Sequence, residues 1–283
     1  MRLRTLLISS FVLFEVARPG TAQQRPLADE VLVGTQSAEL STRIRTIETL
    51  SKVVQDRGSQ QVLADPQIQG ALFDLLQLEN ALTVRLFQDG RGVSGVYGEG
   101  YGEYYAEVLN LAVGVVPLLN PQQQQLWLRE LARGSYNPDS KFAEWLAGYG
   151  DLIIDALVEQ TRSAEIEPNR SNAYAVLTDM VGFTAFSPQA SKPYEHSLSF
   201  MNRQRALTVV NEGLNHKDRN ISREVVWRFK RHPSPEMLIL LQNFLKTQRG
   251  RPGFARRADG PQSLEEEVEK AIDQMQAALG QRR

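Results

Sequence analysis

Residues 65–85 (DPQIQGALFDLLQLENALTVR) decide the fold class of this chain. Asp65 is a favourable helix N-cap, and Pro66 follows at the first helical position, where the missing N–H of proline breaks no hydrogen bond. Apolar side chains then recur at helical spacing on one face: Ile68, Leu72, Leu75, Leu76, Leu82 and Leu86. The only polar interruption is residues 77–81 (QLENA), which we interpret as a tight turn between two helices.

A second segment, residues 214–223 (LNHKDRNISR), matches residues 76–85 (LQLENALTVR) at its key positions. Each begins with leucine, carries a short polar residue in its middle and ends in arginine: Asn80 with Arg85, and Asp218 with Arg223. This arrangement resembles the HEAT-repeat (armadillo-like) family of helical hairpins. The resemblance implies an irregular, all-α, HEAT-like solenoid in which these four residues are structural turn residues that bridge adjacent repeats.

The rest of the chain supports an all-α fold but fits the repeat less well. Helical periodicity recurs after residue 37, and no window alternates apolar and polar residues as a half-buried strand does. Residues 23–36 are polar, with scattered apolar side chains, and predict a short lead-in. Residues 88–195 match the hairpin pattern poorly and predict insertions, so an irregular helical bundle is the alternative fold.

Four segments follow from these patterns. We expect a signal peptide at residues 1–22, a HEAT-like helical domain at 23–248, a basic, glycine-rich linker at 249–262 and a C-terminal capping helix at 263–280. In the last segment, Ser263 and Glu266 have the spacing of a capping box.

The first residues have the pattern of an export signal. Arg2 and Arg4 precede an apolar run that only Glu15 interrupts, and small residues ending at Ala22 offer a cleavage site. An uncleaved N-terminal anchor is the alternative. No later segment is apolar for long enough to span a bilayer, so we expect no membrane insertion of the mature chain and place it in the periplasm or outside the cell.

Composition narrows the possible chemistry. The chain contains no cysteine, which excludes disulfides and thiol catalysis. Its formal net charge is −1, which gives no general attraction to nucleic acid, although basic residues gather in the C-terminal third. The three histidines lack metal-site spacing, and the glycine string at residues 90–95 lacks the strand and helix of a dinucleotide site. We therefore expect no metal, no cofactor and no nucleic-acid partner.

The glycine-rich segment at residues 89–102 is the first candidate for a binding site. Its tyrosines carry apolar rings with polar tips, which suits them to protein contacts. We favour an arrangement in which Tyr97 and Tyr101, with Glu99 between them, face a protein partner, while Tyr104 and Tyr105 anchor the following helix. The alternative is that the tyrosines pack inward and the segment is structural.

A row of carboxylates is the second candidate. Asp151, Asp155 and Glu159 are spaced four residues apart, which places them on one face of a helix. Such a face either binds Ca²⁺ or supplies an acid and a base, or it is simply solvated.

Together these patterns favour an exported, non-catalytic binding or scaffold protein that contacts a protein partner through its helical surface. The alternative function is a cell-envelope enzyme with a carboxylate and tyrosine site near the glycine-rich segment. A purely structural domain of a larger assembly is the third possibility.

The export pattern predicts where the mature chain begins. N-terminal sequencing of the natural protein should begin at or near Gln23, because the small residues before it suit a signal peptidase. Soluble cytoplasmic protein that retains Met1 would contradict this expectation.

Overall fold

The part of the chain that the structure describes is helical. The computed structural model describes residues 24–89, 100–134, 141–186, 198–231, 233–249 and 263–280, and none of these residues lies in a β-strand. The all-α prediction is therefore confirmed for these residues. Among them, no helix has both the length and the apolar character needed to cross a membrane.

The helices and two short 3-10 helices have the following bounds in chain order: α1 (Gln24–Thr35), α2 (Leu40–Arg57), α3 (Ser59–Leu63), α4 (Pro66–Gln88), α6 (Gly100–Val115), η1 (Val116–Leu118), α7 (Pro121–Ala132), α8 (Lys141–Ala147), η2 (Gly150–Leu152), α9 (Ile154–Ser163), α10 (Glu167–Phe186), α11 (Phe200–Leu214), α12 (Arg219–Arg231), α13 (Pro235–Gln248) and α14 (Leu264–Gly280).

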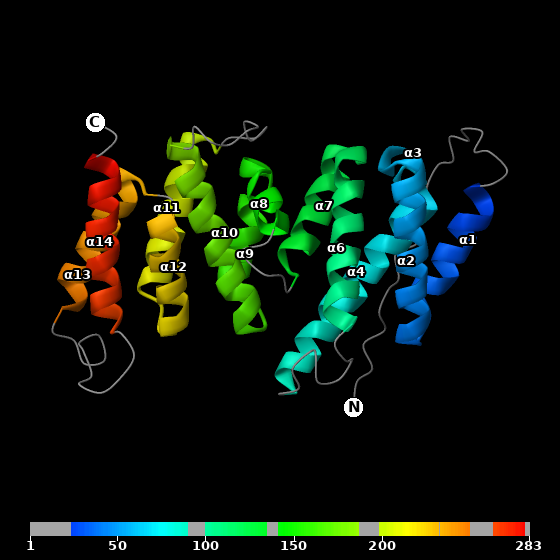
Figure 1. Ribbon diagram of the computed structural model, residues 1–283, viewed down its shortest axis with the longest axis horizontal. Helices are drawn as coiled ribbons and strands as arrows, with labels where there is room; N and C mark the ends of the chain where they lie inside the picture. The colour runs from blue at the N-terminus through cyan, green and yellow to red at the C-terminus, as the bar shows by residue number, and fades with distance from the viewer. Residues whose placement is uncertain are drawn as a thin grey trace, which may run out of the picture.

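The helices stand side by side in a row that follows the chain approximately, from α1 at one end to α13 and α14 at the other (Figure 1). α1 packs against α2 and α4, α7 packs against α9, and α12 packs against α10 and α14. Each helix covers the apolar stripe of its neighbours, so a single cluster of buried hydrophobic side chains extends from α1 to α14.

The helix starts at Asp65 and Ser263 lie where the sequence predicts them, and Asn120 and Gly58 mark two further helix ends. Asp65, Asn120 and Ser263 each accept a backbone N–H hydrogen bond in the first turn of α4, α7 and α14, respectively. Gly58 follows α2 with φ 87°, a conformation that side chains other than that of glycine rarely allow. The predicted lead-in at residues 23–36 is wrong, because α1 occupies most of it.

The predicted turn at residues 77–81 is also wrong, because α4 runs through it without interruption. Gln, Leu, Glu and Ala are all good helix formers, so local propensity favours continuation of the helix. The two polar residues that suggested a turn, Glu79 and Asn80, point into the protein and are buried there. Their polar groups find partners inside, so they need no solvent.

The second matched segment does contain a turn. Residues 215–218 connect α11 to α12, and Asp218 accepts a hydrogen bond from the backbone N–H of Asn220 at 2.9 Å in the first turn of α12. Arg223 lies one turn further on and contacts Glu267 of α14 at 3.3 Å. The two matched segments therefore differ in structure: one is the middle of a helix and the other spans a connection.

Two glycines offer a test of the packing. A Cβ atom at Gly213, near the end of α11, would lie 2.6 Å from the Tyr174 ring and 3.2 Å from Val225, whereas nothing lies within 4 Å of a Cβ at Gly70 in α4. We expect Gly213→Ala to lower the free energy of unfolding by about 1–3 kcal/mol through overpacking. We expect Gly70→Ala to raise it by about 0.5–1 kcal/mol, because alanine is the better helix former.

Chemical denaturation of the two variants measures both effects. Equal shifts of the two midpoints would contradict the packing of α11 against α10 and α12.

Candidate functional site

A buried carboxylate, Glu79 of α4, joins three helices. Its side chain has no exposed surface, and Arg43 of α2 contacts it at 2.8 Å with Nε on Oε1. Tyr101 and Tyr104 of α6 donate their hydroxyl hydrogen bonds to the same carboxylate at 2.7 and 2.8 Å. Arg43 also donates to the backbone oxygen of Ser37 at 2.9 Å, which fixes the connection before α2. The buried charges are therefore both paired and hydrogen-bonded.

The two tyrosines act as hydrogen-bond donors in this cluster. Burial, followed by the negative charge of Glu79, raises the pKa of Tyr101 and of Tyr104 well above the ordinary tyrosine value. Both hydroxyls therefore keep their protons at any physiological pH.

A second buried group of polar side chains begins at the next residue of α4. The side-chain amide of Asn80 donates to the Glu130 carboxylate at 2.7 Å and to the Glu130 backbone oxygen at 3.0 Å. The hydroxyl of Tyr105 donates to Asn80 Oδ1. Asn80 therefore connects α4 and α6 to the last turn of α7.

The end of α7 is held from its other side as well. Asn169 of α10 donates to the backbone oxygen of Arg133 at 2.8 Å. Carbonyl groups at a helix C-terminus lack their usual partners four residues on, and side-chain amides from α4 and α10 donate to two of them here, those of Glu130 and Arg133. The C-terminus of α7 thus becomes a fixed point between the two halves of the helical row.

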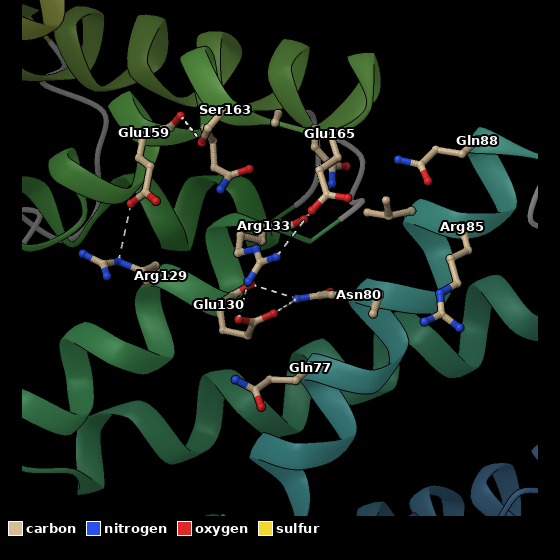
Figure 2. A pocket seen from close by; sticks show the side chains of 15 residues that line it. Gln77, Asn80, Arg85, Gln88, Arg129, Glu130, Arg133, Glu159, Ser163 and Glu165 are labelled. Carbon is tan, nitrogen blue, oxygen red and sulfur yellow. Dashed lines mark hydrogen bonds and ion pairs between the residues drawn. The ribbon is translucent and has the colours of Figure 1, made fainter. Parts of the chain in front are cut away.

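An open cleft of about 630 Å³ lies over this fixed point (Figure 2). One face of α4 forms one wall, α9 and the residues that lead into α10 form the other, and α7 lies between them. Its lining is mostly charged or carries side-chain amides: Gln77, Asn80, Ala81, Val84, Arg85, Gln88, Arg129, Glu130, Arg133, Glu159, Gln160, Ser163, Ala164, Glu165 and Asn169.

Two of the three arginines in the cleft already face carboxylates. Arg129 lies 3.6 Å from Glu159, and Arg133 lies 3.3 Å from Glu130 and 4.0 Å from Glu165. The pairs with Glu159 and Glu165 cross from α7 to the other wall, and their side chains are about half exposed to solvent (Figure 2). Arg85, on the α4 wall, is exposed, and its side chain forms no hydrogen bond or ion pair with the residues that the structure describes.

The structure changes the roles that the sequence predicts for several residues. Tyr101 is 1% exposed and bonded to Glu79, so the prediction that it contacts a partner is wrong. Tyr97 and Glu99 lie outside the described residues. Tyr104 and Tyr105 do anchor α6, as predicted. Asn80 and Arg85 are not turn residues, because both lie within α4.

The predicted row of carboxylates divides between two elements. Asp151 lies in η2 and accepts a hydrogen bond from the backbone N–H of Ser199 at 2.9 Å, whereas Asp155 of α9 pairs with Arg205 of α11. Glu159 faces the cleft and Arg129. Among the described residues, no group of three or more His, Cys, Asp and Glu side chains is arranged to hold a metal ion.

A comparable buried pair lies towards the other end of the row. Arg228 of α12 has no exposed side-chain surface and pairs with Asp179 of α10 and, at 2.7 Å, with Glu224. Burial raises the pKa of Asp179 to about 6, although Arg228 opposes this shift. Each half of the row thus has an arginine–carboxylate pair inside it that joins neighbouring helices.

Comparisons with known proteins do not assign this chain to a family. No protein-family model matches this chain, and no curated protein matches it in sequence. The resemblance to HEAT repeats stays a prediction from the two sequence segments.

Sequence reasoning missed the importance of Glu79 and Glu130, and it saw Asn80 only as a turn residue. The sequence does contain a sign that Glu79 is buried. Glu79 lies four residues after Leu75 and three after Leu76, on the apolar face of the same helix. A polar residue at a core position predicts a buried partner. No such partner could be named, because Arg43 and Tyr101 lie on other helices.

The buried pair and an exposed pair allow a matched comparison. We expect Arg43→Leu to lower the free energy of unfolding by about 3–5 kcal/mol, because it leaves the buried Glu79 carboxylate without its cation. Arg129→Leu removes a pair whose side chains are 58% and 52% exposed, and we expect a change of about 1 kcal/mol or less. Urea denaturation of both variants measures this difference, and similar losses would contradict the structural role of Glu79.

Proposed function

We propose that this chain is an exported, non-catalytic binding or scaffold protein. In this proposal, HEAT-like helical hairpins form an extended array, and the array presents a surface to a protein partner. The export step rests on the sequence pattern of residues 1–22, and the hairpin grouping rests on the family resemblance.

The arrangement of the helices supports an interaction surface. Because the helices stand in a row, the array is elongated and exposes long faces to solvent (Figure 1). Elongated helical arrays of this kind offer extended surfaces for binding. Towards one end of the row, residues 215–218 connect α11 to α12, and Arg223 of α12 contacts Glu267 of α14; both observations support the stacking of helices that we propose.

The observation that carries the proposal is the cleft between α4, α7 and α9. It is open to solvent, the side chains of Asn80 and Asn169 join its walls to the end of α7, and its lining is rich in hydrogen-bonding groups. A preorganised cleft binds a ligand with less loss of conformational freedom than a mobile surface does. Its polar lining suits a polar partner rather than an apolar molecule.

The competing function, an envelope enzyme, has less support. A carboxylate with tyrosines does exist next to the glycine-rich segment, in the form of Glu79 with Tyr101 and Tyr104. All three side chains are buried, and both tyrosines donate to Glu79, so a substrate has no access to them. Of the predicted carboxylate row, Asp155 and Glu159 are in ion pairs.

A substitution that fills the cleft tests the proposal. Ala81 is exposed on the cleft wall of α4, so Ala81→Tyr should place a ring in the cleft while leaving the core intact. We expect this variant to lose capture of a partner from the envelope or extracellular fraction by at least about tenfold, because the ring excludes the ligand by its volume. Quantitative mass spectrometry of the captured proteins measures the loss.

Ala106→Tyr is the matched control, because Ala106 is an exposed alanine of α6 outside the cleft. This variant should capture the same partner as the wild-type chain. An identical set of captured proteins for Ala81→Tyr, Ala106→Tyr and wild type would overturn the proposal that the cleft is the binding surface.

A further inference from the structure

The cleft has an uneven distribution of charge between its walls. The α4 wall contributes Arg85 with Gln77 and Gln88 and has no acidic residue in the lining. The opposite wall contributes Glu159 and Glu165, whose side chains are 52% and 56% exposed. A ligand in the cleft therefore meets a cation and amides on one side and carboxylates on the other.

Arg85 is the cation of the cleft that has no partner among the described residues. The guanidinium groups of Arg129 and Arg133 are each directed at a carboxylate, and Figure 2 shows Arg133 between Glu130 and Glu165. An arginine side chain offers a planar fork of N–H donors that matches a carboxylate. The group on the ligand that fits Arg85 is thus an anion with two oxygens.

The rest of the lining selects among anions. Glu130, Glu159 and Glu165 balance the three arginines of the lining, so the cleft is neutral as a whole and has no cation left to balance the second charge of a phosphate dianion. A carboxylate carries a single charge, which Arg85 alone balances, and the exposed oxygens of Glu159 and Glu165 can accept N–H donors from a ligand in addition to their ion pairs. A peptide has both kinds of group.

The spacing on α4 fits a short extended peptide. Gln77 and Gln88 lie at the two ends of the α4 wall, and the rise of 1.5 Å per residue separates them by roughly 16 Å. An extended chain of about five residues covers that length. Side-chain amides both donate and accept, so they can pair with the alternating N–H and C=O groups of a peptide backbone. Between them, Ala81 and Val84 leave room for a backbone to approach.

We infer that the cleft binds a short, extended peptide segment through a carboxylate group that Arg85 holds. This inference rests on the proposed function and names the chemistry that the partner presents. The carboxylate has two sources, the C-terminus of a partner or an Asp or Glu side chain within it.

Three pools of random pentapeptides separate these sources. The first pool has free C-terminal carboxylates and no acidic side chains, the second is amidated with one central Glu, and the third is amidated with no acidic residue. Passed over the immobilised full chain, the third pool should be retained about tenfold less than at least one of the others. The better retained of the first two pools identifies the source of the carboxylate.

Substitutions at Arg85 complete the test. Arg85→Gln should reduce retention of the carboxylate pool by about tenfold or more, and Arg85→Lys should restore part of it, because lysine keeps the charge without the fork. Arg45→Gln is the matched control, because Arg45 is an exposed arginine of α2 that is not in the lining of the cleft. It should leave retention unchanged, and melting curves should show that all three variants fold.

Equal retention of the three pools, or unchanged retention by Arg85→Gln, would overturn the inference. If Ala81→Tyr nevertheless loses its partner, the proposed function stands without it. If Ala81→Tyr keeps its partner, the proposal that the cleft is the binding surface fails as well.

Discussion

The carboxylate of Glu79 is the group on which the N-terminal half of the structure depends. It lies in the middle of α4, away from solvent, where an unpaired charge would be very costly. Arg43 supplies the opposite charge, and Tyr101 and Tyr104 supply two neutral donors. Because these partners come from α2 and α6, the cluster sets the positions of both helices relative to α4. The apolar core alone does not specify those positions so closely, since hydrophobic contacts are not directional.

α4 connects this buried cluster to the proposed binding surface. Its inward face carries Glu79 and Asn80, and its outward face carries Arg85 on the wall of the cleft. Asn80 bonds Glu130 of α7, whose side chain also lines the cleft and contacts Arg133. The same continuous helix thus fixes the core on one side and one wall of the cleft on the other. A ligand in the cleft would bind to a wall that is already held in place.

The sequence predicts helix starts better than it predicts the roles of the polar residues within the helices. The caps at Asp65, Asn120 and Ser263 are local signals, and each depends on hydrogen bonds within a few residues of the cap. The interpretation of residues 77–81 as a turn is wrong for a different reason. Glu79 and Asn80 are stabilised by side chains that are 22 to 50 positions away in the sequence, so no local pattern separates buried polar residues from those of an exposed turn.

Local sequence patterns do not predict the cleft either. Arg129 and Glu159 come from separate helices, and their proximity depends on how α7 packs against α9. The prediction that tyrosines face a partner is wrong for Tyr101, because tyrosine serves equally well as a contact residue and as a buried donor. Which role it takes depends on whether a buried acceptor lies within reach, and here Glu79 does.

Hydrogen–deuterium exchange of the backbone amides of residues 77–81 is the most direct test of this account. A continuous α4 held by Glu79 requires these amides to exchange as slowly as those of the flanking turns at residues 72–76 and 82–86, because all belong to one helical ladder. We expect uniform protection from residue 72 to residue 86. A segment at 77–81 that exchanges rapidly between two protected flanks would contradict the account and would restore the turn between two helices.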